Sequence, residues 1–176
     1  MRRKSKSVVL IGYMGAGKTT IGKKLAQKLG IAFYDTDELI EQEQGMTVAK
    51  IFEQYSEPYF RDLETGMVKK LSESEKPMVL SVGGGLPVRR ENHEYLKKIG
   101  TVVYLKVSVE ELVRRLSGDS KRPLLKGEME LSEKITEMLR VREPLYLEAC
   151  DYYMETDGKS IFELVTELIN HKGEKA

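Results

Sequence analysis

The stretch GYMGAGKTT, from Gly12 to Thr20, constrains the fold of this chain more than any other part of its sequence. Its glycines, lysine and threonine match the pattern G-x-x-x-x-G-K-[ST] of a phosphate-binding loop. Glycine lets backbone N–H groups curl around phosphate oxygens, and the helix that follows adds the positive potential of its N-terminus. An apolar run at residues 8–11 precedes the stretch and a helical pattern at residues 18–29 follows it, as this loop requires. The sequence therefore predicts a protein that binds a nucleoside triphosphate.

The residue types within the loop predict separate roles. We expect Lys18 to bridge the terminal phosphates of the nucleotide and the hydroxyl of Thr19 to bind Mg²⁺. The helix N-terminus and the backbone amides would surround the remaining phosphate oxygens. The residues expected to bind the nucleotide in this way are Gly15, Ala16, Gly17, Lys18, Thr19 and Thr20.

Apolar, β-branched segments alternate with helical patterns along the chain. Strands are expected at residues 8–11, 31–34, 78–82, 102–107 and 152–154. Capping boxes predict helices that open at Ser108 and Ser160, and Gly30 would end the helix that starts at Lys18. Strands that alternate with helices favour an α/β fold with a parallel sheet covered on both faces.

Length, charge and cysteine content exclude several classes of protein. The 176 residues suffice for one domain, and a formal net charge of +1 gives no reason to expect nucleic acid or a membrane as partner. No apolar stretch approaches the length of a signal peptide or a membrane span. Cys150 is the one cysteine, which fits a reducing cytoplasm and a buried structural role. The asparagines, Asn92 and Asn170, belong to no Asn-Lys-x-Asp motif, so a GTPase switch is excluded.

Two carboxylates, Asp35 and Asp37, follow the second expected strand. The carboxyl ends of parallel strands share one edge of the sheet with the phosphate-binding loop, and ligands bind at that edge. One carboxylate would hold Mg²⁺, directly or through water, and the other would contact the hydroxyl of an acceptor. Because Asp37 also precedes Glu38, a helix N-cap worth about 1 kcal/mol is the structural alternative for it.

Three consecutive glycines, residues 83–85, end the third expected strand. A turn needs only one or two glycines, so the run indicates a ligand that lies against the backbone, with a simple turn as the alternative. Upstream, Arg61 and Glu64 lie three residues apart on one helix face. They form either an exposed ion pair worth about 0.5 kcal/mol, or a guanidinium held flat to capture a substrate carboxylate.

Two further arginines are candidate site residues. Arg142 could make a second contact with a substrate carboxylate, and the nearby Pro144 is expected to break the helix and form a corner there. Arg122 lies in the polar segment 117–130, which we expect to be a mobile lid that brings an arginine over the transferred phosphoryl group. From spacing alone, each of these arginines also fits an exposed position on the surface.

Six motifs together resemble the shikimate kinase family in order and spacing: GYMGAGKTT, DTD, FRDLE, SVGGG, RPLL and REPLY. The resemblance extends from about residue 8 to about residue 169, and the ordered set is far more specific than any one motif. It implies a P-loop NTPase of nucleoside monophosphate kinase-like type, with a five-stranded parallel sheet flanked by helices. It also implies a helical substrate-binding segment at about residues 36–66 and a mobile lid at about residues 117–130, within one kinase domain of residues 1–176.

The activity implied by this resemblance is transfer of the γ-phosphoryl group of ATP to the 3-hydroxyl of shikimate, which gives shikimate 3-phosphate and ADP in aromatic amino-acid biosynthesis. Asp37 would take or orient the hydroxyl proton, while Lys18 and Arg122 would stabilise charge on the transferred group. Thr19 and Asp35 would hold Mg²⁺. Arg115 matches a family position near adenine, and the family's substrate contacts fall on Asp37, Arg61, Gly83, Gly84, Gly85 and Arg142.

Two other functions stay open on the sequence. A related sugar-acid kinase such as gluconate kinase shares the fold and the phosphate-binding loop, although the motifs DTD, FRDLE and SVGGG favour shikimate as the acceptor. A non-catalytic, ATP-binding regulatory protein would be expected to have lost Asp37, Arg122 or a clamp arginine, and all of them are present. We further expect a monomer in the cytoplasm, with ATP and shikimate as its ligands.

Overall fold

The sheet has five strands, all paired in parallel, in a computed structural model that describes residues 7–117 and 125–171. The strand order is β2-β3-β1-β4-β5, so β1 is central. The predicted parallel sheet is confirmed, and each predicted strand end lies within one residue of the observed one. The strands are β1 (Val8–Ile11), β2 (Ala32–Asp35), β3 (Met78–Ser81), β4 (Thr101–Lys106) and β5 (Tyr152–Glu155).

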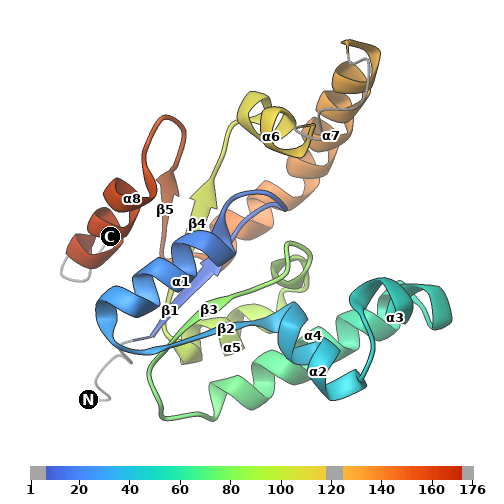
Figure 1. Cartoon of the computed structure of the whole chain (residues 1–176). Coiled ribbons are helices and arrows are strands. Elements are labelled where there is room, and N and C mark those ends of the chain that lie inside the picture. Colours follow the sequence, from blue (N-terminus) through green and yellow to red (C-terminus); the bar gives the residue numbers. More distant parts are fainter. Residues whose placement is uncertain (1–6, 118–124, 172–176) are drawn as a thin grey trace.

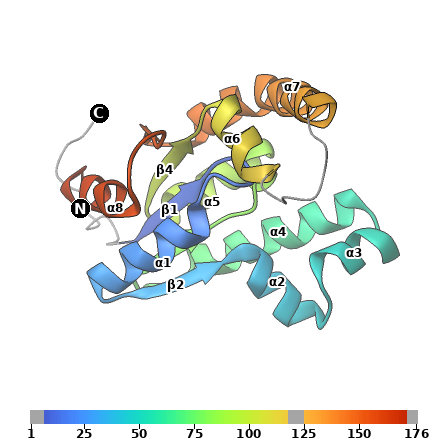
Figure 2. The same cartoon turned by 45° about the horizontal axis from the view of Figure 1, so that its top comes forward.

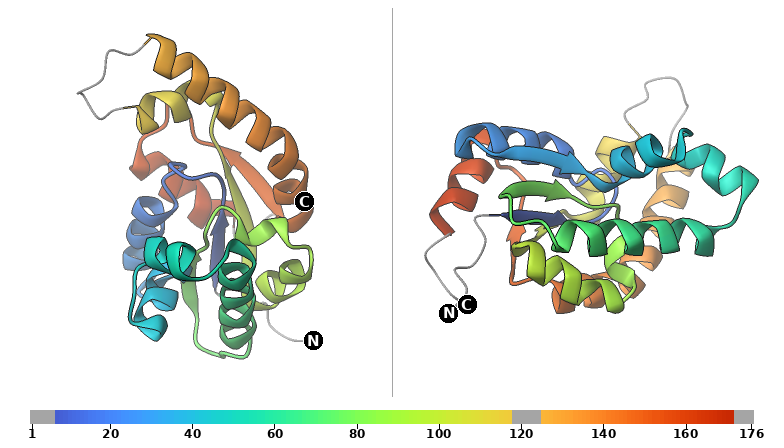
Figure 3. Two further views of the ribbon diagram at one scale, coloured as in Figure 1. Left: turned by 90° about the vertical axis from the view of Figure 1, so that its right-hand side faces the viewer. Right: turned by 90° about the horizontal axis from the view of Figure 1, so that it is seen from below.

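Helices cover both faces of this sheet (Figure 1). On one face α1 (Lys18–Leu29) lies beside α8 (Ile161–Asn170), and the opposite face is covered by α4 (Glu57–Ser72), α5 (Glu91–Ile99) and the later part of α7 (Leu125–Ala149), as Figure 3 shows. The other elements are α2 (Thr36–Gln44), α3 (Val48–Gln54), α6 (Val109–Leu116) and the short 3₁₀ turn η1 (Leu86–Val88). Across residues 7–117 and 125–171, no helix is both long enough and apolar enough to span a bilayer.

The central strand β1 connects two hydrophobic cores because its side chains alternate between the faces of the sheet. Val8 and Leu10 pack into the core under α1 and α8, whereas Val9 and Ile11 pack into the core under α5 and α7. All four side chains are buried, as expected for a strand covered on both faces. The carboxyl end of β1, where the phosphate-binding loop begins, is therefore fixed from both sides.

Two groups of helices lie on either side of the carboxyl edge of the sheet (Figure 2). One group consists of α2, α3 and the start of α4. These elements make up the predicted substrate-binding segment 36–66. This group has a small core of its own, formed by Ile40, Ile51, Phe60 and Met67. The other group is α6 with the first part of α7. Between the groups come the ends of β1, β2 and β3, where the sequence predicts the site.

One local prediction is wrong, and another is confirmed only in part, since α6 does open at Ser108. Pro144 does not break the helix, since α7 continues to Ala149. The missing N–H and ring of an interior proline cost about 3 kcal/mol, and burial of Tyr146 and Ala149 against the sheet offsets this cost. The capping box at Ser108 is incomplete, because Asp157 Oδ1 accepts the Ser108 N–H at 3.1 Å in place of the Glu111 side chain. The second predicted box, at Ser160, is confirmed.

The packing of α1 on β2 depends on a glycine. A Cβ built on Gly22 would lie 2.6 Å from Cε2 of Phe33 and 3.3 Å from Cδ1 of Leu10. We expect Gly22→Ala to lower the free energy of unfolding by about 1–3 kcal/mol, because the ring must move within a packed layer. Urea denaturation followed by circular dichroism measures this difference.

Gly66, which lies exposed in α4, is the matched control. A Cβ there would meet no atom within 4 Å, so Gly66→Ala should stabilise the protein by about 0.5–1 kcal/mol through helix propensity. Equal effects of the two substitutions would contradict the packing described for Gly22.

Candidate active site

The phosphate-binding loop joins β1 to α1 at the centre of the carboxyl edge. Gly15 and Gly17 have left-handed backbone angles, with φ of 84° and 89°. The helix α1 begins after Gly17 without a side-chain cap and has no acidic residue in its first turn. By contrast, α2, α3, α4, α6 and α8 start at a Ser, Thr or Asp whose side chain accepts a backbone N–H. The first amides of α1 are therefore available to an anion.

Lys18 folds back onto this loop. Its Nζ donates to the carbonyl oxygens of Gly12 at 2.7 Å and Tyr13 at 3.0 Å. Burial lowers the pKa of Lys18 to about 8, although the nearby carboxylates of Asp35 and Asp37 act in the opposite direction. A bound phosphate would supply the opposite charge that this desolvated ammonium group lacks.

Asp35, at the end of β2, binds both the next helix and the loop. Its Oδ1 accepts the backbone N–H of Asp37 at 2.9 Å, so Asp35 is the N-cap of α2. The structural alternative for Asp37 as an N-cap is wrong, because α2 already begins at Thr36. The second oxygen of Asp35, Oδ2, accepts the hydroxyl of Thr19 at 3.2 Å. One carboxylate oxygen and one hydroxyl oxygen thus lie together beside the loop.

Asp37 and Glu64 bring two carboxylates together over Gly83. A Cβ built on Gly83 would lie 2.8 Å from Oε1 of Glu64 and 3.0 Å from Oδ1 of Asp37. Both oxygens are buried, and within the described part of the chain neither has a hydrogen-bond partner. Burial raises the pKa of both groups, that of Glu64 to about 7. Buried acceptors of this kind require donors, and ligand hydroxyls would supply them.

Glu64 also holds Arg61, as the spacing of the two residues predicts. The guanidinium donates from Nη1 to Oε2 of Glu64 at 2.7 Å and from Nη2 to Oε1 of Glu57 at 3.1 Å. The side chain of Glu64 is 1% exposed and that of Arg61 is 17% exposed, so the alternative of an exposed ion pair is wrong. The guanidinium lies against Gly85, where a Cβ would overlap it.

Arg142 reaches the same glycine loop from α7. Its Nη1 would lie 3.5 Å from a Cβ on Gly84, and its charge contributes to the low pKa of Lys18. Among residues 7–117 and 125–171 it forms no ion pair. Two guanidinium groups therefore flank the glycine loop, one held by carboxylates and one without a countercharge.

The remaining predicted residues belong to the nucleotide side. Arg115, on α6, donates from Nη1 to the carbonyl oxygen of Gly15 at 3.0 Å, so it lies beside the loop. Thr20 is exposed in the first turn of α1. Arg122 and the rest of residues 118–124 of the predicted lid lie outside the described residues, and residues 125–130 of that lid belong to α7. The role of Arg122 stays a prediction.

Two residues of the site have no role in the sequence-based prediction. The backbone N–H of Gly83 donates to Oγ1 of Thr36 at 3.1 Å, and the hydroxyl of Tyr146 donates to the carbonyl oxygen of Gly84 at 2.5 Å. Both lie inside motifs that the sequence singles out, DTD and REPLY. Because their partners are backbone atoms, residue type and spacing give no signal for these contacts.

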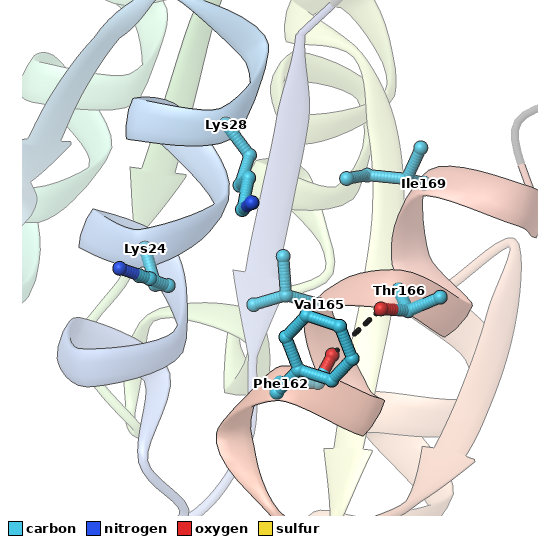
Figure 4. A pocket seen from close by; sticks show the side chains of 6 residues that line it. All are labelled: Lys24, Lys28, Phe162, Val165, Thr166 and Ile169. Atoms are coloured by element: carbon cyan, nitrogen blue, oxygen red, sulfur yellow. Dashed lines mark hydrogen bonds between the residues drawn. The ribbon is translucent and has the colours of Figure 1, made fainter.

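A separate pocket of about 200 Å³ lies between α1 and α8 (Figure 4). It is lined by Lys24, Lys28, Phe162, Val165, Thr166 and Ile169. Its floor is apolar and its charged groups are lysines of α1, so it offers neither a carboxylate nor an arginine to an acceptor. It contains none of the residues predicted for the site, and the candidate site is the one at the carboxyl edge.

The uncapped N-terminus of α1 and the buried carboxylates of Asp37 and Glu64 share the carboxyl edge of the sheet, where Arg61 and Arg142 lie beside the glycine loop. Nucleotide on the loop and a small acceptor over the glycine strand end would meet at Lys18, which is the arrangement of a small-molecule kinase of the P-loop class.

Comparisons with known proteins define the family. The family model for shikimate kinase matches residues 14–172. A shikimate kinase from Persephonella marina is 41% identical over 164 residues, which cover 93% of this chain and 97% of the relative. A structure of shikimate kinase from Acinetobacter baumannii in complex with shikimate is 38% identical, with a TM-score of 0.83, and the match covers 96% of this chain and 95% of that one. The chain belongs to the shikimate kinase family, and the predicted family is confirmed.

A gluconokinase from Sinorhizobium meliloti is also similar in structure, with a TM-score of 0.54 over 96% of this chain and 92% of that one. Its sequence identity is 17%, so the likeness shows the shared fold alone.

The lowered pKa of Lys18 predicts how ATP binding depends on pH. An ammonium group binds phosphate and a neutral amine does not, so the affinity for ATP should be constant from neutral pH up to about 8. Above that pH it should weaken, with a slope that approaches tenfold per pH unit. Isothermal titration of ATP at a series of pH values measures the profile.

Lys18→Met is the control, because it lacks the titrating group. Its affinity should be lower at neutral pH and should show no inflection near pH 8. The same inflection in both proteins would assign the titration to another group.

Proposed function

We propose that this chain transfers the γ-phosphoryl group of ATP to the 3-hydroxyl of shikimate. The observation that carries this proposal is the set of unsatisfied groups around the glycine loop. Among residues 7–117 and 125–171, two buried carboxylate oxygens of Asp37 and Glu64 lack donors, and the guanidinium of Arg142 lacks a countercharge. A small carboxylic acid with several hydroxyl groups complements both deficits at once, and shikimate is such an acid.

On the acceptor side, Arg61 and Arg142 would bind the carboxylate of shikimate. Arg61 enters this interaction already oriented, because Glu64 and Glu57 hold two of its nitrogens. A neutral analogue would leave Arg142 desolvated and unpaired, so the pair of arginines selects for acids. Gly83, Gly84 and Gly85 let the ring of the substrate approach the backbone.

Asp37 would act on the reacting hydroxyl. Its raised pKa and its position near Lys18 suit a group that accepts a hydrogen bond from the hydroxyl and takes its proton as the new O–P bond forms. At the same time the bond between the β- and γ-phosphates breaks and ADP leaves. Lys18 would stabilise the charge that develops on the transferred group, together with Arg122.

The nucleotide would lie on the loop from Gly15 to Thr20, with Arg115 at its adenine end. Thr19 and Asp35 fit Mg²⁺, because their oxygens are adjacent and magnesium is commonly held by one or two protein oxygens and by phosphates. The bound ion would neutralise phosphate charge. The described residues contain no cluster of three or more His, Cys, Asp or Glu side chains suited to a metal, so we assign the rest of its coordination to nucleotide and water.

A gluconate kinase shares the fold alone, at 17% identity, and a non-catalytic ATP-binding protein is the alternative from another class. The arrangement around Gly83 favours catalysis on an acid, because it supplies a carboxylate next to the phosphate loop as well as two arginines. A monomer in the cytoplasm also stays a prediction, in line with a chain that has one cysteine.

The test is ADP release by the purified protein with ATP and Mg²⁺, compared with shikimate, shikimate methyl ester, gluconate and no acceptor. We expect shikimate to accelerate release, and kcat/KM for the ester to be lower by about a hundredfold or more, because the ester lacks the charge that pairs with Arg61 and Arg142.

Release of ADP with gluconate alone would show that gluconate and not shikimate is the acceptor. The assignment of the phosphate-binding loop to ATP would be unaffected. ATP binding without release in any mixture would favour the regulatory alternative.

A further inference from the structure

Tyr146 links the helix that carries Arg142 to the glycine loop. It lies four residues after Arg142 on α7, so the two side chains share one face of the helix. The residue is 0% exposed, and its hydroxyl donates to the carbonyl oxygen of Gly84 at 2.5 Å. Gly84 stands between the glycine that contacts Asp37 and Glu64 and the glycine that contacts Arg61. This hydrogen bond therefore joins the two halves of the acceptor site.

The same stretch of α7 is also tied to the sheet. Glu143 Oε1 accepts the hydroxyl of Tyr104 at 3.1 Å and pairs with Nζ of Lys106 at 3.0 Å, both from β4. The rings of Tyr104 and Tyr146 are in contact, with centroids 5.2 Å apart. One attachment thus fixes α7 to β4, and the other fixes it to the glycine loop.

These ties act where the helix itself is weakest. Pro144 has no backbone N–H, so the carbonyl oxygen of Arg140 lacks its usual donor one turn earlier. Arg142 lies inside the interrupted turn, next to Glu143 and four residues before Tyr146. Glu143 holds the helix to the sheet on one side of Pro144, and Tyr146 holds it to the loop on the other.

We propose that the hydroxyl of Tyr146 is a positioning group for the acceptor, which sets the separation between the guanidinium groups of Arg142 and Arg61. Arg142 belongs to α7, whereas Arg61 lies against Gly85 in the glycine loop. The hydrogen bond from Tyr146 to Gly84 holds α7 at a fixed distance from the glycine loop, so that both guanidinium groups can contact one carboxylate. This inference rests on the proposed binding of the shikimate carboxylate by the two arginines.

Tyr146→Phe tests the inference, because it removes the hydroxyl and keeps the buried ring. We expect KM and Kd for shikimate to rise about tenfold, the effect of one buried hydrogen bond transmitted to a charged contact. The Kd for ATP should stay within about twofold, because the hydroxyl donates its hydrogen bond to Gly84, outside the phosphate loop. The preference for shikimate over its methyl ester, as a ratio of kcat/KM values, should fall by about the same tenfold.

Tyr104→Phe is the matched control. It removes a hydroxyl from an equally buried ring that also contacts α7, but Lys106 still holds Glu143 to the sheet. Its melting temperature should fall, while the preference for acid over ester should stay within about twofold of the unmodified protein. Comparing the two variants separates a general loss of packing from a loss of carboxylate recognition.

A double substitution locates the effect. In an Arg142→Ala background, Tyr146→Phe should change the Kd for shikimate by less than about twofold, because the group that it positions is absent. Additive losses would overturn the inference, as would an unchanged preference for acid over ester in Tyr146→Phe. A Tyr146→Phe variant too unstable to assay would also count against it, because the hydroxyl would then serve the fold as a whole.

The unmodified protein distinguishes this failure from that of the proposed function. If it neither binds nor phosphorylates shikimate, the proposed function fails and the inference fails with it. If it does both and only the variants depart from expectation, the inference alone fails.

Discussion

The close approach of the glycine backbone to the pair of Arg61 and Glu64 is the constraint on which the acceptor site depends. Glu64 is buried in α4, and the hydrogen bond from Arg61 offsets only part of the cost of burying its carboxylate. The guanidinium in turn lies against Gly85. The carboxylates of Glu64 and Asp37 approach Gly83 so closely that a side chain at this position would clash with them. The absence of side chains in this loop is what allows α2 and α4 to bring their charged groups to the end of β3.

This arrangement leaves charge and hydrogen-bonding capacity unsatisfied in the free protein. Burial lowers the pKa of Lys18 and raises that of Asp37 and Glu64, so each of these groups is held in an environment that disfavours its charge. Buried charged groups of this kind lower the stability of the protein when no ligand is bound to them. Their concentration around one loop, next to the uncapped N-terminus of α1, is the physical signature of a binding site for a charged substrate and a nucleotide.

The sequence predicts most of the fold because periodicity and glycine placement depend on local chemistry. The phosphate-binding loop and the five strands follow from such patterns, and the spacing of Arg61 and Glu64 places them on one helix face. The contacts of Thr36 and Tyr146 with the glycine loop are different, since they join backbone atoms to side chains far away in the chain. The continuation of α7 through Pro144 is likewise decided by burial of Tyr146 and Ala149, which a local propensity rule does not include. Arg122 and the lid stay predictions.

The measurement that tests the central role of the glycine loop most directly is shikimate binding by Gly85→Ala, followed by isothermal titration. The added methyl group would displace the guanidinium of Arg61 while the phosphate loop stays unchanged. We predict that the affinity for shikimate falls by about tenfold or more and that the affinity for ATP stays within about twofold. An unchanged affinity for shikimate would contradict the arrangement of Arg61 and the glycine loop as the site of the acceptor.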